Sequence, residues 1–237
     1  MALGPQQVED PAGGFGGSLT VTRRTLTAGL LIVVALGPTS AQAAGIDAAS
    51  YRAAAASGAI GAVAGRVYEE RKRPETPDHP LAGTAVIMLP KSDDVLKKLE
   101  EIRRVARNSA DDYRAAGPSI LAVRRAYEKE LWDSGAVDLV KATTVDAEGR
   151  FAVADLPAGD WLLIATHSVK IDKHAAPGPP KQRGVYTSKT HLTGFQRVTV
   201  WLREITIANG RSENLELTDR GAWFSGIVEE RAPDAGR

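Results

Sequence analysis

The chain contains no cysteine, and this absence excludes several kinds of site at once. Disulfide bonds, thiolate nucleophiles, thiolate metal ligands and a lipid on an N-terminal cysteine all require a sulfhydryl group. A large charge of either sign is also lacking, because 30 basic residues are balanced by 29 acidic ones, for a net charge of +1. No overall field therefore favours nucleic acid or a strongly acidic partner.

The short motifs of common catalytic and nucleotide sites are absent as well. There is no H-E-x-x-H pair for a zinc protease, no G-x-S-x-G nucleophile turn and no glycine-rich phosphate loop before a helix. Among the four histidines, His174 and His191 share a segment with Asp172, which makes a metal site conceivable, although solvated loop residues are the favoured interpretation. We therefore expect no enzyme activity, no cofactor and no metal.

What is present begins with an export signal over residues 1–43. Arg23 and Arg24 precede an apolar run at 28–36, and the small residues Ala41 and Ala43 suit a signal peptidase. The two arginines are interpreted as the basic region of an ordinary signal peptide, which is favoured over a twin-arginine export signal. The apolar run is shorter than the ~20 residues that cross a bilayer, so an uncleaved N-terminal anchor is the second interpretation. We expect cleavage near Ala43 and a periplasmic or secreted protein.

The rest of the chain predicts one mainly β domain, a Greek-key β-sandwich of seven to eight strands. An alanine-rich lead-in covers 44–61, the domain covers 62–230, and 231–237 is expected to be a flexible tail. Short runs of strand-forming residues between turn signals are typical of a sandwich. The expected strands include 63–68, 84–89, 139–145, 161–165, 196–202 and 223–228. Asn209-Gly210 predicts a hairpin between 205–207 and 214–217.

An α-helical hairpin is expected to interrupt the strands at 92–134. Apolar residues recur at helical spacing on both sides of Gly117-Pro118. Glycine commonly ends a helix and proline commonly begins one, so the two helices are predicted to meet at this pair. The hairpin either covers one face of a sheet, which is the favoured interpretation, or projects as an arm that binds a partner.

The most specific local pattern is the stretch 142–164, which predicts two tight turns between strands. Asp146 favours the first position of a type I turn, and Gly149 tolerates positive φ at its end. Leu156-Pro-Ala-Gly-Asp160 predicts the second turn. These residues therefore have geometric roles that account for them without any catalysis.

The order of these segments resembles the carboxypeptidase regulatory-like domain, a transthyretin-like (prealbumin-like) β-sandwich. The residues that carry the resemblance are Gly65–Val67, Pro80–Val86, Thr143–Phe151, Leu156–Leu162 and Ile205–Leu217. Trp161 stands where the family usually has tyrosine, and the segments 92–134 and 168–195 have no place in the usual compact domain. The resemblance implies an accessory module without an active site. The fold is also similar to that of starch-binding modules.

Two groups of residues are candidates for binding. The predicted loop 168–195 is basic and could bind an anionic polymer or lipid headgroup, although a solvated loop is favoured; its candidates are Lys170, Lys173, Lys181, Arg183, Tyr186 and Lys189. Trp161, Trp201 and Trp223 lie on expected strands, where they either stack on sugars or, as is more usual, belong to the core.

Our leading hypothesis is an exported, non-catalytic module for binding or assembly at the cell envelope, whose partner is an envelope protein or a polysaccharide. The alternative is a carbohydrate-binding module of the starch-binding-like fold. An accessory subunit of a hydrolase is a third, weaker hypothesis. Nucleic acid is not expected as a partner.

Overall fold

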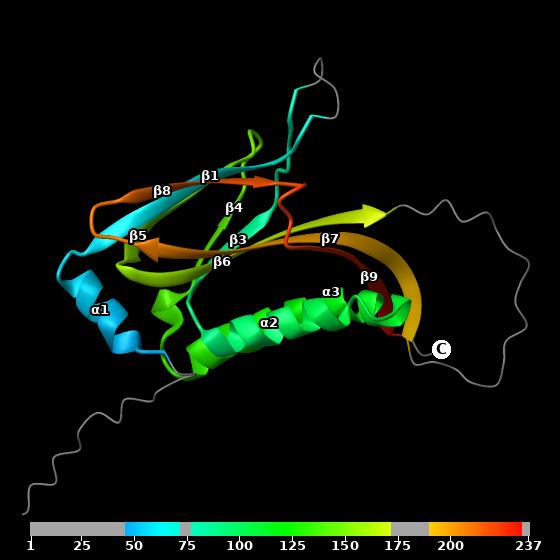
Figure 1. Ribbon diagram of the computed structural model, residues 1–237, viewed down its shortest axis with the longest axis horizontal. Coiled ribbons are helices and arrows are strands. Elements are labelled where there is room, and N and C mark those ends of the chain that lie inside the picture. Colours follow the sequence, from blue (N-terminus) through cyan, green and yellow to red (C-terminus); the bar gives the residue numbers. More distant parts are fainter. Residues whose placement is uncertain (1–45, 72–76, 172–189, 234–237) are drawn as a thin grey trace, which may run out of the picture. The chain divides into compact units, whose positions relative to one another are not determined.

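A computed structural model describes residues 46–71, 77–171 and 190–233, all within one compact unit, Ser40–Arg237 (Figure 1). The expected β-sandwich with helices is confirmed: the described residues form two sheets that share one hydrophobic core. Nine strands are present in these residues, one of them only two residues long. No helix in this part of the chain is long and apolar enough to cross a membrane.

The first sheet is built around β1 (Ile60–Glu69). Its partners are β5 (Arg150–Pro157) and the short β2 (His79–Pro80), both antiparallel, and β8 (Ser212–Thr218), which is parallel. Alternation along β1 turns Val63 and Val67 into the core and leaves Arg66 exposed. One face of this sheet is therefore buried and the other faces solvent.

The second sheet is antiparallel and has the order β4-β3-β6-β7-β9. Its strands are β3 (Ala85–Pro90), β4 (Lys141–Thr144), β6 (Gly159–Ile171), β7 (Thr190–Ile207) and β9 (Phe224–Pro233). Every residue of β6 from Trp161 to Thr166 is buried, so this strand is covered on both faces. The two covers are the first sheet and a layer of helices.

The helices are α1 (Ala48–Ala56), α2 (Asp93–Val105) and α3 (Ala110–Asp133), with a 3₁₀ turn η2 at Val137–Leu139. The Tyr127 hydroxyl of α3 donates to the Pro90 carbonyl at 2.8 Å, just before α2 begins. The end of α3 therefore returns to the start of α2, as in an antiparallel hairpin (Figure 1). Arg124 of α3 also lies 3.5 Å from the Thr166 hydroxyl of β6, so the hairpin covers the second sheet and does not project.

The boundary between the two helices is not where the sequence predicted it. Helix α3 runs unbroken through Gly117 and Pro118, and the chain turns instead at 106–109. Ser109 begins α3 by accepting a hydrogen bond from the Asp112 backbone N–H at 3.0 Å. Gly117 serves packing: a Cβ there would lie 3.2 Å from Val228 of β9. The predicted helix end at Gly117 was wrong because glycine occurs both at helix ends and where a helix packs closely on a neighbour, and here it does the second.

The predicted hairpin at Asn209-Gly210 is also wrong. The strands that flank it belong to different sheets, because β7 pairs with β6 and β9 while β8 pairs with β1. Gly210 has the positive φ of 70° that a tight turn requires, but its backbone N–H donates to the Ile60 carbonyl of β1. The sequence therefore predicted the turn at Asn209-Gly210 correctly. It predicted the wrong pairing for β8, which pairs with β1 and not with β7.

Two predicted irregular segments contain strand. Residues 168–171 extend β6 and residues 190–195 begin β7, with Ser168 opposite Val198 and Ile171 opposite Phe195, so the predicted loop 168–195 was too long at both ends. Strand β9 likewise runs to Pro233, into the predicted tail. Polar residues at a sheet end lack the apolar alternation by which strands are recognised.

Candidate functional site

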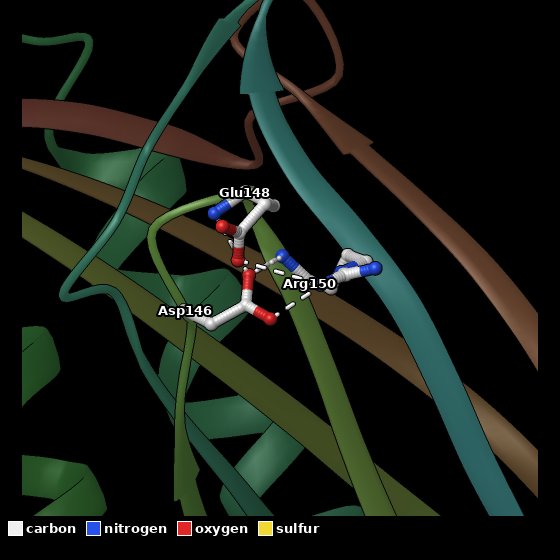
Figure 2. A network of polar contacts seen from close by, with 3 residues as sticks. All are labelled: Asp146, Glu148 and Arg150. Carbon is white, nitrogen blue, oxygen red and sulfur yellow. Dashed lines mark hydrogen bonds and ion pairs between the residues drawn. The ribbon is translucent and has the colours of Figure 1, made fainter.

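The turn between β4 and β5 is held by one carboxylate. Asp146 Oδ1 accepts hydrogen bonds from the backbone N–H groups of Glu148 at 3.0 Å and Arg150 at 2.7 Å (Figure 2). The Gly149 N–H donates to the Asp146 carbonyl at 3.1 Å, and Gly149 has a φ of 81°. A tight turn is therefore present where it was expected, and Gly149 completes it with a positive φ that a residue without a Cβ adopts freely.

The same turn places a guanidinium group at the edge of the first sheet. Arg150 Nε lies 3.3 Å from Asp146 Oδ2, and its terminal nitrogen lies 3.3 Å from Glu148 Oε2 (Figure 2). Arg150 is the direct cross-strand partner of Arg66 on β1. Two arginines opposite each other repel, but Asp146 and Glu148 balance the charge of Arg150, and Glu216 of β8 is the neighbour of Arg66 on its other side.

Arg66 is held from its other side by an aromatic ring. Its guanidinium carbon lies 5.2 Å from the ring centroid of Tyr68, two residues along the same strand. Such a contact is worth about 0.5–1 kcal/mol at an exposed site. Tyr68 is itself fixed, because its hydroxyl donates to Glu216 of β8 at 3.1 Å. Arg66 forms no ion pair with any residue that the structure describes.

A shallow cavity of about 490 Å³, which we name the outer groove, contains both arginines. Its floor is formed by small or flat residues of β1 and β5, and its polar residues come from β4, the β4–β5 turn, β1, β5 and β8. The lining residues are Ala64, Gly65, Arg66, Thr143, Thr144, Asp146, Arg150, Phe151, Ala152 and Asn214. The outer groove thus lies at the edge of the first sheet, where its terminal strand β5 comes beside β4 of the second sheet.

The outer groove combines donors with acceptors. The guanidinium groups only donate, the Asp146 carboxylate only accepts, and the Asn214 amide and Thr143 and Thr144 hydroxyls can do both. Hydrogen bonds from the Arg150 backbone hold the pKa of Asp146 below its usual range, and the nearby Arg150 guanidinium adds to this shift. Asp146 is therefore an anion at neutral pH and is poorly suited to donating a proton.

Three larger cavities differ from the outer groove in character, and one of them, of about 550 Å³, lies along α2 and is lined only by charged residues. A second, of about 640 Å³, lies beside α1, where Lys91 is paired with Glu204 at 2.7 Å and the Tyr51 hydroxyl donates to the Asp160 carbonyl. The third, of about 680 Å³, lies beside α3 and is mainly apolar. The outer groove contains Arg66 and Asn214, whose side chains make no hydrogen bond to another described residue.

Two of the tryptophans predicted as sugar-stacking residues are fully buried. Trp161 and Trp201 have no exposed surface, and their indole N–H groups donate to the carbonyls of Pro157 at 2.9 Å and Thr218 at 2.6 Å. Neither ring can present a face to a sugar. Both belong to the core, which corrects the stacking hypothesis for these two residues.

Trp223 is partly exposed, but its ring is already occupied. Its indole N–H donates to Glu100 of α2 at 3.0 Å, and the guanidinium carbon of Arg103 lies 5.3 Å from its ring centroid. Trp223 therefore joins α2 to the start of β9. The tryptophan with the greatest exposure among the described residues is Trp132, at 67%, near the end of α3.

The predicted basic residues fall largely outside the described part of the chain. Only Lys170 lies within it: its exposed side chain extends from β6, with Nζ 3.9 Å from Glu230 Oε1. The remaining candidates, at 172–189, are outside the described residues; they are Lys173, Lys181, Arg183, Tyr186 and Lys189. The structure therefore does not bring this group together.

The minor metal hypothesis also falls largely outside the described range. Asp172 and His174 are not described, and His191 is described only in its backbone, opposite Ala232. Within the described residues no three histidine or acidic side chains are grouped as a metal site would require.

Arg66, Arg150 and Asn214 were not predicted from the sequence as site residues, and Asp146 was predicted only as a turn residue. The signal that could have found Arg66 is alternation: Ala64, Arg66 and Tyr68 share the outer face if Val63 and Val67 face the core. The cross-strand neighbours could not be found in this way, because register with β5 and β8 depends on long-range pairing.

Comparison with known proteins yields no family. No protein-family model matches the sequence, and no curated protein sequence matches it significantly. Among solved structures, the chain is similar to a candidate carbohydrate-binding protein from Pseudomonas aeruginosa, with 14% identity and a TM-score of 0.38 over 68% of this chain and 88% of that one.

Two further structures are pilus proteins. The minor pilin of Streptococcus agalactiae has 11% identity and a TM-score of 0.28, over 76% of this chain and 48% of that one. The pilus backbone protein of Streptococcus pneumoniae has 12% identity and a TM-score of 0.24, over 67% of this chain and 40% of that one. None of these similarities assigns the chain to a family.

Proposed function

We propose that this chain is an exported, non-catalytic β-sandwich, of the carboxypeptidase regulatory-like type, that acts as a binding module at the cell envelope through the outer groove. The observation that carries the proposal is Arg66, which is exposed in the outer groove and forms no ion pair with a described residue. Its cross-strand neighbour Arg150 is already balanced by Asp146 and Glu148. A ligand with hydrogen-bond acceptors can therefore pair with the Arg66 guanidinium.

A binding role, as opposed to catalysis, is supported by the state of the groove's carboxylate. Asp146 is fixed by the backbone of its own turn and has a lowered pKa, so it can accept a hydrogen bond but is a weak general base or acid. Export is supported by the signal pattern at residues 23–43, which lies outside the described residues.

A carbohydrate ligand is the second, more specific candidate. Sugar hydroxyls both donate and accept, and the outer groove offers both partners through Asp146, Asn214 and Thr143. The sequence suggested that sugars stack on tryptophan rings, but Trp161 and Trp201 are buried. The binding proposed here uses polar side chains of the outer groove instead.

The test is a glycan array and a pull-down from envelope extract, each performed with residues 44–237 and with an Arg66→Glu variant. We expect at least one retained glycan or envelope component whose binding the charge reversal abolishes. An exposed arginine on the helical hairpin, Arg107, supplies the matched control as Arg107→Glu. Retention that is identical for wild type and Arg66→Glu would contradict the proposed site.

A further inference from the structure

Strand β8 lies at an outer edge of the first sheet. It pairs only with β1, which has β5 and β2 on its other side. Two hydrogen bonds show which backbone groups of β8 this pairing uses. The Ala62 N–H of β1 donates to the Arg211 carbonyl at 3.0 Å. At the other end of the strand, the Asp219 N–H donates to the Tyr68 carbonyl of β1 at 3.2 Å. The groups that face β1 are therefore those of the odd-numbered residues.

The even-numbered residues of β8 direct their backbone N–H and C=O groups away from the sheet, because successive residues of a strand face opposite sides. These residues are Ser212, Asn214 and Glu216, and all three are exposed. No described residue pairs with their outward backbone groups. Strand β8 thus presents a row of donors and acceptors with the spacing of a β-ladder.

The other edges of the two sheets are protected in ways that β8 is not. Helix α3 covers part of β9, where the Tyr113 hydroxyl donates to the Ser225 carbonyl at 2.6 Å. The pairing of β5 with β1 is irregular around Asp155, whose φ is 54°. Strands β4 and β2 have four and two residues. Bulges, short strands and covering helices are the usual protection of a sheet edge, and in the described structure β8 has no bulge, no proline and no covering helix.

We propose that β8 binds an extended segment of a partner protein, which adds a strand to the first sheet and carries basic side chains. The backbone of an extended peptide supplies donors and acceptors at the same spacing as the outward groups of β8, whereas a sugar or a lipid does not. This inference concerns the backbone edge of β8 and goes beyond the function proposed for the outer groove.

The side chains of β8 favour a basic partner. The two charged residues of the strand, Glu213 and Glu216, are both acidic, and neither forms an ion pair with a described residue. They lie on opposite faces of the sheet, three positions apart, so the complementary peptide carries two basic residues at the same separation. A second copy of this chain fits less well. Antiparallel pairing of β8 with itself, centred on Asn214, would bring the two Glu213 side chains within about 7–8 Å of each other.

The probe is a fluorescent peptide of seven residues, the length of β8, with the sequence Thr-Val-Lys-Val-Thr-Lys-Thr. In antiparallel pairing its two lysines lie opposite Glu216 and Glu213, and its C-terminal carboxylate lies beside Arg211. Fluorescence anisotropy with residues 44–237 should show saturable binding. The peptide with glutamate in place of both lysines should bind at least about 5-fold more weakly, because two attractive contacts become repulsive.

Methylation of single peptide nitrogens tests the backbone pairing without altering the protein. The N–H of the fifth peptide residue would face β8, opposite Asn214, and the N–H of the fourth would face solvent. N-methylation of the fifth residue should weaken binding at least about 10-fold, because a hydrogen bond is lost and the methyl group clashes with β8. N-methylation of the fourth residue is the matched control and should change binding by less than about 2-fold.

A substitution in β8 tests the same pairing from the side of the protein. Ser212→Pro removes an outward N–H at the start of an edge strand, a position where proline is tolerated, and should also weaken binding at least about 10-fold. Ser212→Ala keeps this N–H and should bind as the wild type does. Thermal melts of both variants show whether they fold.

Three results would overturn the inference. The first is no binding of the lysine peptide at about 1 mM, or binding that survives both Ser212→Pro and N-methylation of the fifth residue. The second is equal binding of the lysine and glutamate peptides, which would exclude a basic partner. The third is a wild-type dimer in sedimentation that Ser212→Pro dissociates, which would assign the edge to a second copy. All of these measurements are independent of Arg66, whose variants test the outer groove.

Discussion

Gly65 has no side chain, and this allows β8 and the Phe151 ring to approach β1 closely in the first sheet. A Cβ at this position would lie 2.3 Å from the Leu215 carbonyl oxygen of β8 and 2.9 Å from the Phe151 ring. Backbone atoms of a paired strand cannot move aside as the end of a long side chain can. We expect Gly65→Ala to destabilise the fold by about 3 kcal/mol, the upper end for overpacking.

Urea unfolding followed by circular dichroism measures this change. Gly221→Ala is the matched control, because its nearest neighbour to a new Cβ is the Arg203 guanidinium at 3.4 Å, an ordinary contact. Its effect should stay within about 0.5 kcal/mol. Equal stability of the two variants would show that β8 does not approach β1 as closely as described.

Tyr127 gives the fold a defined response to alkaline pH. Burial raises the pKa of its phenol above the ordinary value of 10.0. The unfolded chain ionises first as pH rises, so the stability that the neutral phenol contributes is present below pH about 10 and is lost above it. Tyr127→Phe should cost about 1 kcal/mol at neutral pH, because the Pro90 carbonyl loses its donor.

The difference between wild type and Tyr127→Phe should then narrow as pH rises above about 10, since only the wild type loses this contribution. Urea unfolding of both proteins at neutral and alkaline pH measures it. A difference that stays constant across this range would show that the phenol is accessible to water.

Among the residues of the outer groove, the sequence predicted the local backbone conformation but not which side chains are neighbours. The turn at Asp146 and Gly149 could be predicted, because a tight turn is determined by local backbone conformation. The meeting of Arg150 with Arg66 could not, since it requires the register between β5 and β1, which are separated by more than 80 positions in the sequence. Local patterns therefore predicted each residue's backbone but not its neighbours.

At the scale of elements, helix α3 differs most clearly between the prediction from sequence and the structure. Pro118 lies within the helix, where it has no N–H to donate to the Arg114 carbonyl. Interior proline costs a helix up to about 3 kcal/mol relative to alanine. We expect Pro118→Ala to stabilise the protein by about 1–3 kcal/mol in urea unfolding.

A helix boundary at Gly117-Pro118, as predicted from the sequence, would give a different stability for Pro118→Ala. If a helix began at Pro118, alanine there would change stability little, because the first turn has no interior hydrogen bond to restore. Ser109→Ala is the companion variant: loss of the cap of α3 should cost about 1 kcal/mol. A neutral Pro118→Ala together with a neutral Ser109→Ala would support the boundary at Gly117-Pro118.

Strand predictions failed for a related reason. Apolar alternation identified the parts of β6 and β7 that face the core, but not residues 168–171 and 190–195, where the two strands continue as a polar ribbon. Asn209-Gly210 suggested a hairpin although the chain passes there from one sheet to the other. Backbone pairing continues where side-chain burial ends, and only burial leaves a periodic signal.

At the scale of the whole molecule, the described fold begins just after the predicted cleavage site. Ile46 is buried, with 6% of its surface exposed, and Asp47 caps α1 by accepting a hydrogen bond from the Ser50 N–H at 3.2 Å. Cleavage after Ala43 or Ala44 would therefore leave these contacts intact. We expect N-terminal sequencing of the exported protein to begin at Ala44 or Gly45.

A substitution at the cleavage site tests this expectation. Signal peptidase requires small side chains at the first and third positions before the cut, so the double variant Ala43→Phe, Ala44→Phe should block cleavage at either position and leave a larger, membrane-associated precursor. Val137→Phe, an exposed position in the folded domain, controls for a general effect of an added aromatic residue. Mature protein that retains the apolar run at 28–36 would instead establish the uncleaved N-terminal anchor. In that case the outer groove would act at the membrane surface, tethered there by the chain's own N-terminus.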